Sequence, residues 1–222
     1  MYGRLWKTRK ALSFVLDSVR SRIGYLLIRT CAANPNPRCL GAMRRVNRIQ
    51  LTPDELSAVI AVIKEKGCEA KLLVFGCGND SAFWTRLNHK GTTVFLEDNP
   101  SWLRRVIHRF PDLVAYVVRY DTRLSDWRES IEAPVPPTID LPLEIAQEQW
   151  DVILVDAPAG WTPESPGRLQ SIATARKVVS MPGHVFVHDC DREAENLIST
   201  RLLSDTNLIK QVGRLRHYLI RA

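Results

Sequence analysis

The sequence predicts an α/β domain, with a mainly parallel sheet covered by helices on both faces. Short, unbroken apolar runs recur from residue 71 onward, and such runs are typical of strands that are buried on both faces. Helical segments separate most of these runs, and this alternation is the pattern of a parallel sheet. The 222 residues are 45% hydrophobic and 25% charged, which indicates a single globular domain and excludes a disordered chain.

Residues 1–48 are predicted to form a basic helical extension that precedes a domain of residues 49–222. The extension holds eleven Lys and Arg residues against one acid, Asp17, so it carries a charge of +10, whereas the other 174 residues carry −3. Within it, residues 11–28 place apolar side chains at helical spacing between flanking arginines. We expect the apolar side of this helix either to pack on the domain or to lie on a membrane surface or another anionic partner.

A loop and a second helix follow the extension. The loop is Asn-Pro-Asn-Pro at residues 34–37. The helix begins with Thr52 as its N-cap and Pro53 in the first helical position, and Glu55 completes a capping box. We expect this helix to run to Gly67.

The remaining elements alternate along the chain. We expect strands at residues 72–75, 93–96, 115–118, 151–155 and 184–187, and helices at residues 81–88, 101–109, 167–180 and 191–203. The proline-rich segment 124–149 is predicted to be an irregular excursion, and residues 212–220 a terminal hairpin or edge strand.

The cysteines and the hydropathy pattern bear on the compartment. Five cysteines, an odd number without a CxxC pair, disfavour a structural zinc site and favour reduced thiols, with a Cys31–Cys39 bridge as the alternative. No stretch approaches the roughly 20 apolar residues of a membrane span, and no secretory signal pattern is present. We therefore expect a cytoplasmic location.

Acidic residues follow four of the five predicted strands. They are Glu97, Asp121, Asp156 and Asp189. The carboxyl ends of parallel strands meet at one edge of the sheet, which is where ligands bind in such folds. Carboxylates crowded there would repel one another, so the pattern predicts a cationic or hydroxyl-rich ligand.

The first strand is followed by a glycine loop, Gly76-Cys77-Gly78. Glu97 ends the next strand 21 residues after Gly76, which is where an acid binds a ribose diol in nucleoside-binding folds. Ser81 stands at the third position of the dinucleotide fingerprint, so the glycine set is incomplete for a pyrophosphate. The loop therefore favours S-adenosylmethionine (SAM), whose sulfonium is cationic, over a nicotinamide cofactor. The expected cofactor-binding residues are Gly76, Cys77, Gly78, Ser81, Glu97, Asp98, Asp121 and Asp156.

Longer strings carry a family resemblance. They include LLVFGCGNDS (72–81), LNHKGTTVFLEDNPSW (87–102), VRYDT (118–122), WDVILVDAPAGWTPESPGR (150–168), VFVHDCDRE (185–193) and GRLRH (213–217). On these strings the chain resembles the glucuronoxylan 4-O-methyltransferase family. The resemblance implies a Rossmann-like, SAM-dependent fold and methylation of O-4 of glucuronic acid on xylan. It also implies a Golgi membrane association as the alternative location, and a non-catalytic role in polysaccharide assembly as the alternative function.

The resemblance and the strand ends suggest catalytic roles. A sugar hydroxyl is a poor nucleophile until its proton is removed, so Asp156 or His188 is the expected base. By analogy with catechol-type enzymes of similar fold, Asp156 and Asp189 alternatively hold a divalent metal ion. The predicted acceptor is an acidic sugar or a related hydroxylated compound, and the acidic body disfavours nucleic acid. The expected substrate-binding residues, all in matching strings, are Trp161, Arg168, Arg192, Arg216 and His217.

Overall fold

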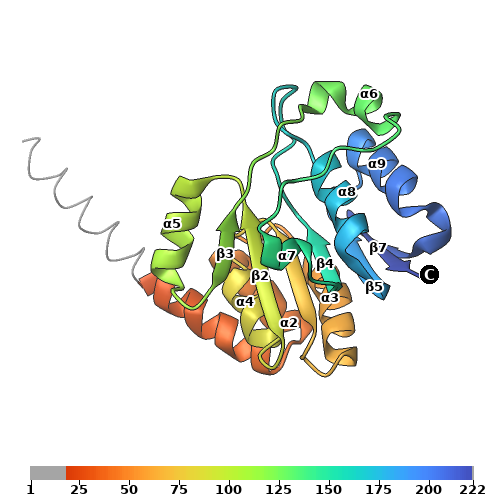
Figure 1. Cartoon of the computed structure of the whole chain (residues 1–222). Helices are drawn as coiled ribbons and strands as arrows, with labels where there is room; N and C mark the ends of the chain where they lie inside the picture. The colour runs from red at the N-terminus through yellow and green to blue at the C-terminus, as the bar shows by residue number, and fades with distance from the viewer. Residues whose placement is uncertain (1–18, 222) are drawn as a thin grey trace, which may run out of the picture.

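The computed structural model describes residues 19–221, and a seven-stranded sheet forms its centre (Figure 1). The strand order is β3-β2-β1-β4-β5-β7-β6, in which β1 to β5 pair in parallel and β7 runs antiparallel to β5 and β6. The strands are β1 (Lys71–Phe75), β2 (Thr92–Glu97), β3 (Val114–Val117), β4 (Trp150–Val155), β5 (Val179–Val187), β6 (Leu208–Val212) and β7 (Leu215–Ile220). The predicted parallel sheet and terminal hairpin are confirmed.

Helices cover both faces of the sheet, as predicted, because alternate side chains of each inner strand are buried on opposite sides. Leu72 and Val74 of β1 pack into one core cluster, and Leu73 and Phe75 into the other. The first cluster lies under α2 (Pro37–Asn47), α3 (Pro53–Glu65), α4 (Ser81–Leu87) and α5 (Pro100–Arg109). The second lies under α6 (Trp127–Ile131), α7 (Leu143–Ala146), α8 (Leu169–Val178) and α9 (Glu193–Leu203). Two short 3₁₀ turns, η1 (Leu124–Asp126) and η2 (Asp205–Asn207), directly precede α6 and β6.

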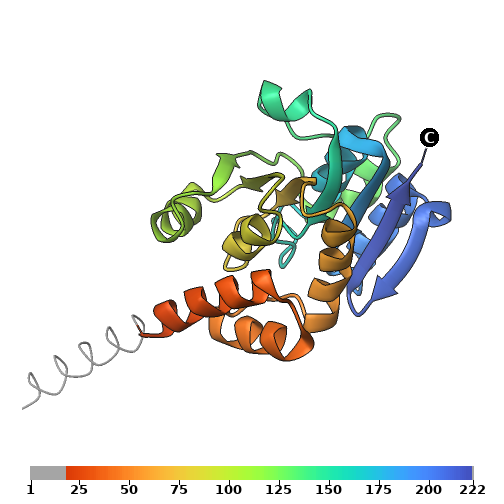
Figure 2. The ribbon, with the colours of Figure 1, turned by 90° about the horizontal axis from the view of Figure 1, so that it is seen from below.

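The described part of the basic extension packs on the domain. Residues 19–33 form a helix, and α2 follows after Asn36, whose side chain caps its first turn. Ile28 of this helix and Met43 of α2 are fully buried in the first core cluster, together with strand residues. Figure 2 shows both helices beside α3 on one side of the sheet. The described part of the extension therefore shares a hydrophobic core with residues on the other side of position 48. Residues 11–18 of the predicted helix lie outside the described residues.

A disulfide joins Cys31 to Cys39 and ties the helix of residues 19–33 to α2. The expectation of reduced thiols is wrong for this pair, whereas Cys68, Cys77 and Cys190 are free. Among residues 19–221, no helix has both the length and the apolar character needed to span a bilayer.

Most elements match the prediction to within two residues, and the larger differences lie at the start of β5 and in the segment 124–149. The helix expected over 167–180 ends at Val178, and β5 begins directly at Val179. Residues 179–183 contain a valine and a proline, both of which disfavour helix continuation. The predicted excursion at 124–149 contains the short helices α6 and α7.

Candidate active site

The loop after β1 is shaped by a glycine. Gly76 has a φ of +111°, a conformation that side chains rarely adopt, and a Cβ on it would lie 3.0 Å from the Cβ of Ala157. Gly76 therefore allows the loops that follow β1 and β4 to approach closely. These two strands are neighbours at the point where the strand order reverses, which is where ligands bind in doubly wound sheets.

Glu97, the last residue of β2, joins the loop after β1 to the loop after β2. Its Oε2 accepts a hydrogen bond from the backbone N–H of Cys77 at 3.0 Å, and its Oε1 accepts one from Asn99 at 2.9 Å. The carboxylate is buried, and this burial raises its pKa although both hydrogen bonds act in the opposite direction. Each oxygen has one further lone pair, so Glu97 retains the capacity to accept hydroxyl donors.

Asp80 and Ser81 lie where the loop after β1 meets α4. Ser81 Oγ accepts from the backbone N–H of Gly78 at 2.8 Å, and so stabilises the loop. Asp80 occupies the N-cap position of α4, but its side chain accepts from Trp84 Nε1 at 2.9 Å and makes no capping hydrogen bond. Burial, followed by the neighbouring Asp156 carboxylate, raises the pKa of Asp80 to about 6.

Two adjoining cavities open at this edge of the sheet. A smaller cavity of about 270 Å³ is lined by the loop from Gly76 to Asp80, and a larger one of about 480 Å³ by the segment from Pro158 to Trp161. Both are lined by Gln50, Glu97, Trp102, Asp156 and Ala157, which makes them one continuous cleft. Asp98 lines the larger cavity. The cleft therefore brings together most of the predicted cofactor residues.

Trp102 and Gln50 are cleft residues that the sequence reasoning missed. Trp102 Nε1 donates to the carbonyl of Cys77 at 2.6 Å, so the indole supports the glycine loop from the first turns of α5. The only local signal for Trp102 was its place in a family-like string. Gln50 lies in the connection between α2 and α3 and carries no motif.

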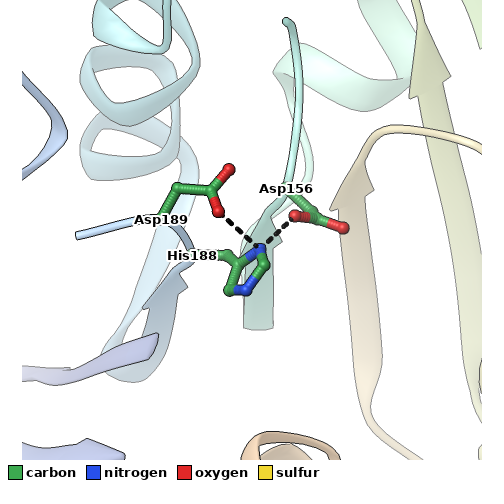
Figure 3. Close-up of side chains that lie close together, drawn as sticks. All are labelled: Asp156, His188 and Asp189. Carbon is green, nitrogen blue, oxygen red and sulfur yellow. Dashed lines mark hydrogen bonds and ion pairs between the residues drawn. The ribbon is translucent and has the colours of Figure 1, made fainter. Parts of the chain in front are cut away.

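Asp156 and His188 form a hydrogen-bonded pair at the ends of β4 and β5. His188 Nδ1 lies 2.7 Å from Asp156 Oδ1 and 3.5 Å from Asp189 Oδ1, and Figure 3 shows the ring between the two carboxylates. The Asp156 side chain is 24% exposed and lines both cavities, whereas His188 is completely buried. Asp156 is therefore the member of the pair that a ligand can reach.

The far side of His188 faces Glu55, a residue that the sequence reasoning assigned only to a helix cap. The capping box is present, because Thr52 N donates to Glu55 Oε2 at 2.7 Å. The same oxygen lies 3.7 Å from His188 Nε2, a buried atom without a hydrogen-bond partner. Burial alone would raise the pKa of Glu55, but hydrogen bonds from Thr52 and Arg214 lower it. Glu55 therefore places a carboxylate beside the unpartnered Nε2 of His188.

Asp189 is enclosed by three arginines. Its Oδ2 lies 2.7 Å from Arg168 and 3.0 Å from Arg192, and its Oδ1 lies 2.8 Å from Arg214. Burial opposes the charge, but these guanidinium groups and His188 hold the pKa of Asp189 below its usual value. A divalent cation bound by Asp156 and Asp189 would have to displace or approach these cations. The residues therefore do not fit the predicted metal site, although Asp156, His188 and Asp189 lie close enough together to suggest one.

The predicted substrate residues have different surroundings. Trp161 is 68% exposed and Arg192 stacks over its ring at 4.5 Å, and both line the larger cavity. Arg168 also lines this cavity, but it is buried and its guanidinium binds Asp189 and the carbonyls of Asp156 and His188. Arg168 therefore holds the β4 and β5 loops together.

Six predicted residues do not line the cleft: Ser81, His188 and Asp189, described above, and Asp121, Arg216 and His217. Asp121 exchanges hydrogen bonds with the buried Gln170 of α8. Arg216 donates to the carbonyl of Asn196 and to Thr200 on α9. His217 pairs with His184 at 2.9 Å and stacks on Phe186, and burial lowers its pKa to about 3. The side chains of Arg216 and His217 contact other parts of the fold, and the exposed Asp121 contacts α8, so none of the three contributes to the walls of the two cavities.

Comparisons with known proteins found a matching family and similar sequences. The model of the IRX15/IRX15L/GXM family matches residues 54–135 and 137–218. Glucuronoxylan 4-O-methyltransferase 1 of Arabidopsis thaliana is 36% identical over 214 residues, which are 85% of this chain and 76% of that protein. Arabinogalactan O-methyltransferase 2 of the same plant is 36% identical over 193 residues, covering 75% and 66%. A putative caffeoyl-CoA O-methyltransferase from Staphylococcus aureus is a similar solved structure, with 12% identity, a TM-score of 0.49 and coverage of 89% and 98%.

The strand order and the names of the sequence relatives place the chain among the SAM-dependent methyltransferases, which confirms the enzyme class that the sequence predicted. The family match extends over most of the chain and includes every strand end that forms the cleft. The chain therefore belongs to the IRX15/IRX15L/GXM family.

Proposed function

We propose that the chain transfers a methyl group from SAM to a hydroxyl of an acidic sugar in a polysaccharide. The observation that carries this proposal is the position of Asp156, whose partly exposed carboxylate lies where the two cavities meet. The named relatives methylate glucuronoxylan and arabinogalactan, and both names indicate a polysaccharide acceptor.

The residues of the cleft fit SAM. Glu97 accepts the ribose hydroxyls, and the loop from Gly76 to Asp80 encloses the methionine end, where the Asp80 carboxylate favours a cation. When bound, SAM supplies an electrophilic methyl carbon. No divalent ion takes part, because Asp189 is neutralised by arginines.

Asp156 acts as the general base in this proposal, and His188 acts as a positioning residue. The hydrogen bond from His188 fixes one oxygen of the Asp156 carboxylate and leaves the other to receive the proton of the sugar hydroxyl. His188 is fully buried and therefore cannot contact the acceptor. This arrangement favours Asp156 over His188, the alternative that the sequence left open.

Trp161 and Arg192 bind the acceptor at the wall of the larger cavity. An exposed indole offers a flat apolar face for a sugar ring, and the adjacent guanidinium suits a uronate carboxylate. The Asp189 carboxylate holds Arg192 in place from the other side.

The Cys31–Cys39 disulfide favours an oxidising compartment over the cytoplasmic location predicted from the sequence. Polysaccharide methylation in the Golgi lumen, the alternative implied by the family resemblance, agrees with this pairing.

The experiment that tests the function is methyl transfer from labelled SAM to glucuronic acid-bearing oligosaccharides, combined with calorimetry of SAM binding. Asp156→Asn is expected to abolish turnover and to leave SAM affinity within about twofold, because the amide keeps the shape and loses the basicity. Glu97→Ala is expected to weaken SAM at least about tenfold, since it removes the ribose acceptor.

Two results would contradict the proposal. Retained turnover in Asp156→Asn would remove Asp156 from proton transfer. Tight SAM binding without turnover of any acidic or neutral sugar by the unmodified chain would favour a non-catalytic role. Glu132→Ala, at a carboxylate that is 72% exposed, is the matched control and is expected to change neither quantity.

A further inference from the structure

A second cavity, outside the cofactor cleft, is lined by arginines. It has a volume of about 310 Å³, and we call it the basic recess. Its lining includes Arg20, Arg48, Arg109, Asn79 and Trp102. Arg48, Asn79 and Trp102 also line the smaller cavity of the cleft, so the recess and the cofactor site share one wall.

The charge of the basic recess is uncompensated within the described chain. None of its lining residues is acidic, and no carboxylate of residues 19–221 lies within ion-pair distance of Arg20, Arg48 or Arg109. Arg109 Nε is buried without a hydrogen-bond partner. Three cations that converge on one cavity repel one another, and an anion in the cavity would relieve this repulsion.

Specific packing builds the basic recess. Asn47 of α2 donates to the carbonyl of Gly24 at 3.2 Å and accepts from Arg109 Nη2 at 3.3 Å, so it joins three helices. Arg20 Nε donates to the carbonyl of Val46 at 2.9 Å. Arg20 and Arg109 are therefore held in place by the fold. Arg20 belongs to the helix of residues 19–33, and Arg109 belongs to α5.

We propose that the basic recess binds the carboxylate of an acidic sugar of the acceptor chain, next to the sugar that is methylated. Guanidinium groups bind carboxylates through paired hydrogen bonds, and the Trp102 ring and the Asn79 amide suit the rest of a sugar. The shared wall with the cofactor cavity places such a sugar close to the reacting groups. This inference rests on the proposed function, because it identifies a second contact of the same acceptor.

The methionine carboxylate of SAM is the other anion within reach, because Arg48 borders both cavities. Arg20 and Arg109 line the basic recess and neither cavity of the cofactor cleft. Three guanidinium groups exceed what one amino-acid carboxylate needs, and two of them lie beyond the shared wall. We therefore assign the recess to the acceptor, and the experiment separates the two sources.

The test is calorimetry in the presence of S-adenosylhomocysteine, so that no turnover occurs. The probes are an oligosaccharide with two glucuronic acid residues and its carboxyl-reduced form. Arg48→Gln, whose side chain makes no hydrogen bond to a described residue, is expected to weaken the charged probe about tenfold. Arg109→Gln should act in the same way, since Arg109 lies outside the cofactor cavities. Neither variant should change binding of the reduced probe.

The control is Arg45→Gln, an exposed arginine of α2 outside the basic recess that removes the same charge. It should leave binding of both probes unchanged, and thermal melting checks that each variant folds. An equal loss for Arg45→Gln and Arg48→Gln would overturn the proposal in favour of unspecific charge attraction. A loss of S-adenosylhomocysteine affinity with unchanged binding of the charged probe would assign the recess to the methionine carboxylate instead. Neither outcome depends on methyl transfer by the protein, so failure of the proposed function is detected separately.

Discussion

Asp80 shows how a single residue links the shape of the cleft to its charge. The side chain is fixed by Trp84, faces the Asp156 carboxylate and lines the smaller cavity. Burial and Asp156 disfavour its ionised form, which is why its pKa rises to about 6. The sequence could not predict this shift of the pKa, because it depends on Asp156, which lies far away along the chain.

The raised pKa of Asp80 predicts a pH dependence of SAM binding. Above pH 6 the carboxylate is ionised and attracts the cationic methionine end, and below pH 6 it gains a proton and loses this attraction. The Kd for SAM is therefore expected to rise about fivefold between pH 7.5 and pH 5, which corresponds to about 1 kcal/mol for one screened charge pair. Calorimetry across this range measures the effect.

Asp80→Asn is the control, because it removes the titrating group with little change of shape. Its Kd is expected to stay nearly constant over the same range. If Asp80→Asn kept the full slope, the titration would belong to Glu97, whose pKa is also raised and which lines the same cavity.

At the scale of elements, the strands and the loops directly after them could be predicted from local patterns. Gly76 and Glu97 each lie within one short segment, at a strand end that its apolar run defines, and both line the cleft. Glu55 satisfies a capping box within its own helix, so nothing in its local sequence indicates its approach to His188. His217 was expected to bind substrate because it belongs to a family-like string, but its ring stacks on Phe186.

The position of the extension, like that of Glu55, depends on tertiary packing. Arg48 and Gln50 reach the cleft because the helix of residues 19–33 and α2 pack on the sheet, and no periodicity within residues 1–48 predicts that placement. Gly24 allows this packing, because it has no side chain at the point where the helix of residues 19–33 meets Asn47 of α2. A Cβ at Gly24 would lie 2.4 Å from Asn47 Oδ1, well inside any tolerated contact.

Gly24→Ala is therefore expected to lower the free energy of unfolding by about 1–3 kcal/mol, because the methyl group displaces Asn47. Gly41→Ala is the matched variant in α2, where a Cβ would meet no atom within 4 Å. It should raise stability by up to about 1 kcal/mol, since alanine favours helix. Urea unfolding of both variants measures the difference, and equal effects of the two would contradict the packing described here.

At the scale of the whole molecule, the extension and the sheet share one core, and the Cys31–Cys39 disulfide secures that arrangement. Ile28, Leu40 and Met43 are buried in the same cluster as residues of β1, β2 and β4. Loss of the extension would uncover this cluster and remove two of the arginines of the basic recess. Stability and ligand binding are therefore coupled through the same 30 residues, numbers 19–48.

The disulfide is expected to stabilise the fold by about 2–3 kcal/mol, because it closes a short loop, with the cysteines eight positions apart, in the unfolded chain. Urea unfolding with and without a reductant measures this contribution. The Cys31→Ala/Cys39→Ala double variant should have the unfolding free energy of the reduced protein, and a reductant should not change it. Thiol labelling of the denatured, unreduced protein should find the three cysteines at 68, 77 and 190, and all five after reduction. Five reactive thiols before reduction, or a midpoint that the reductant leaves unchanged, would contradict the bridge and remove the argument for an oxidising compartment.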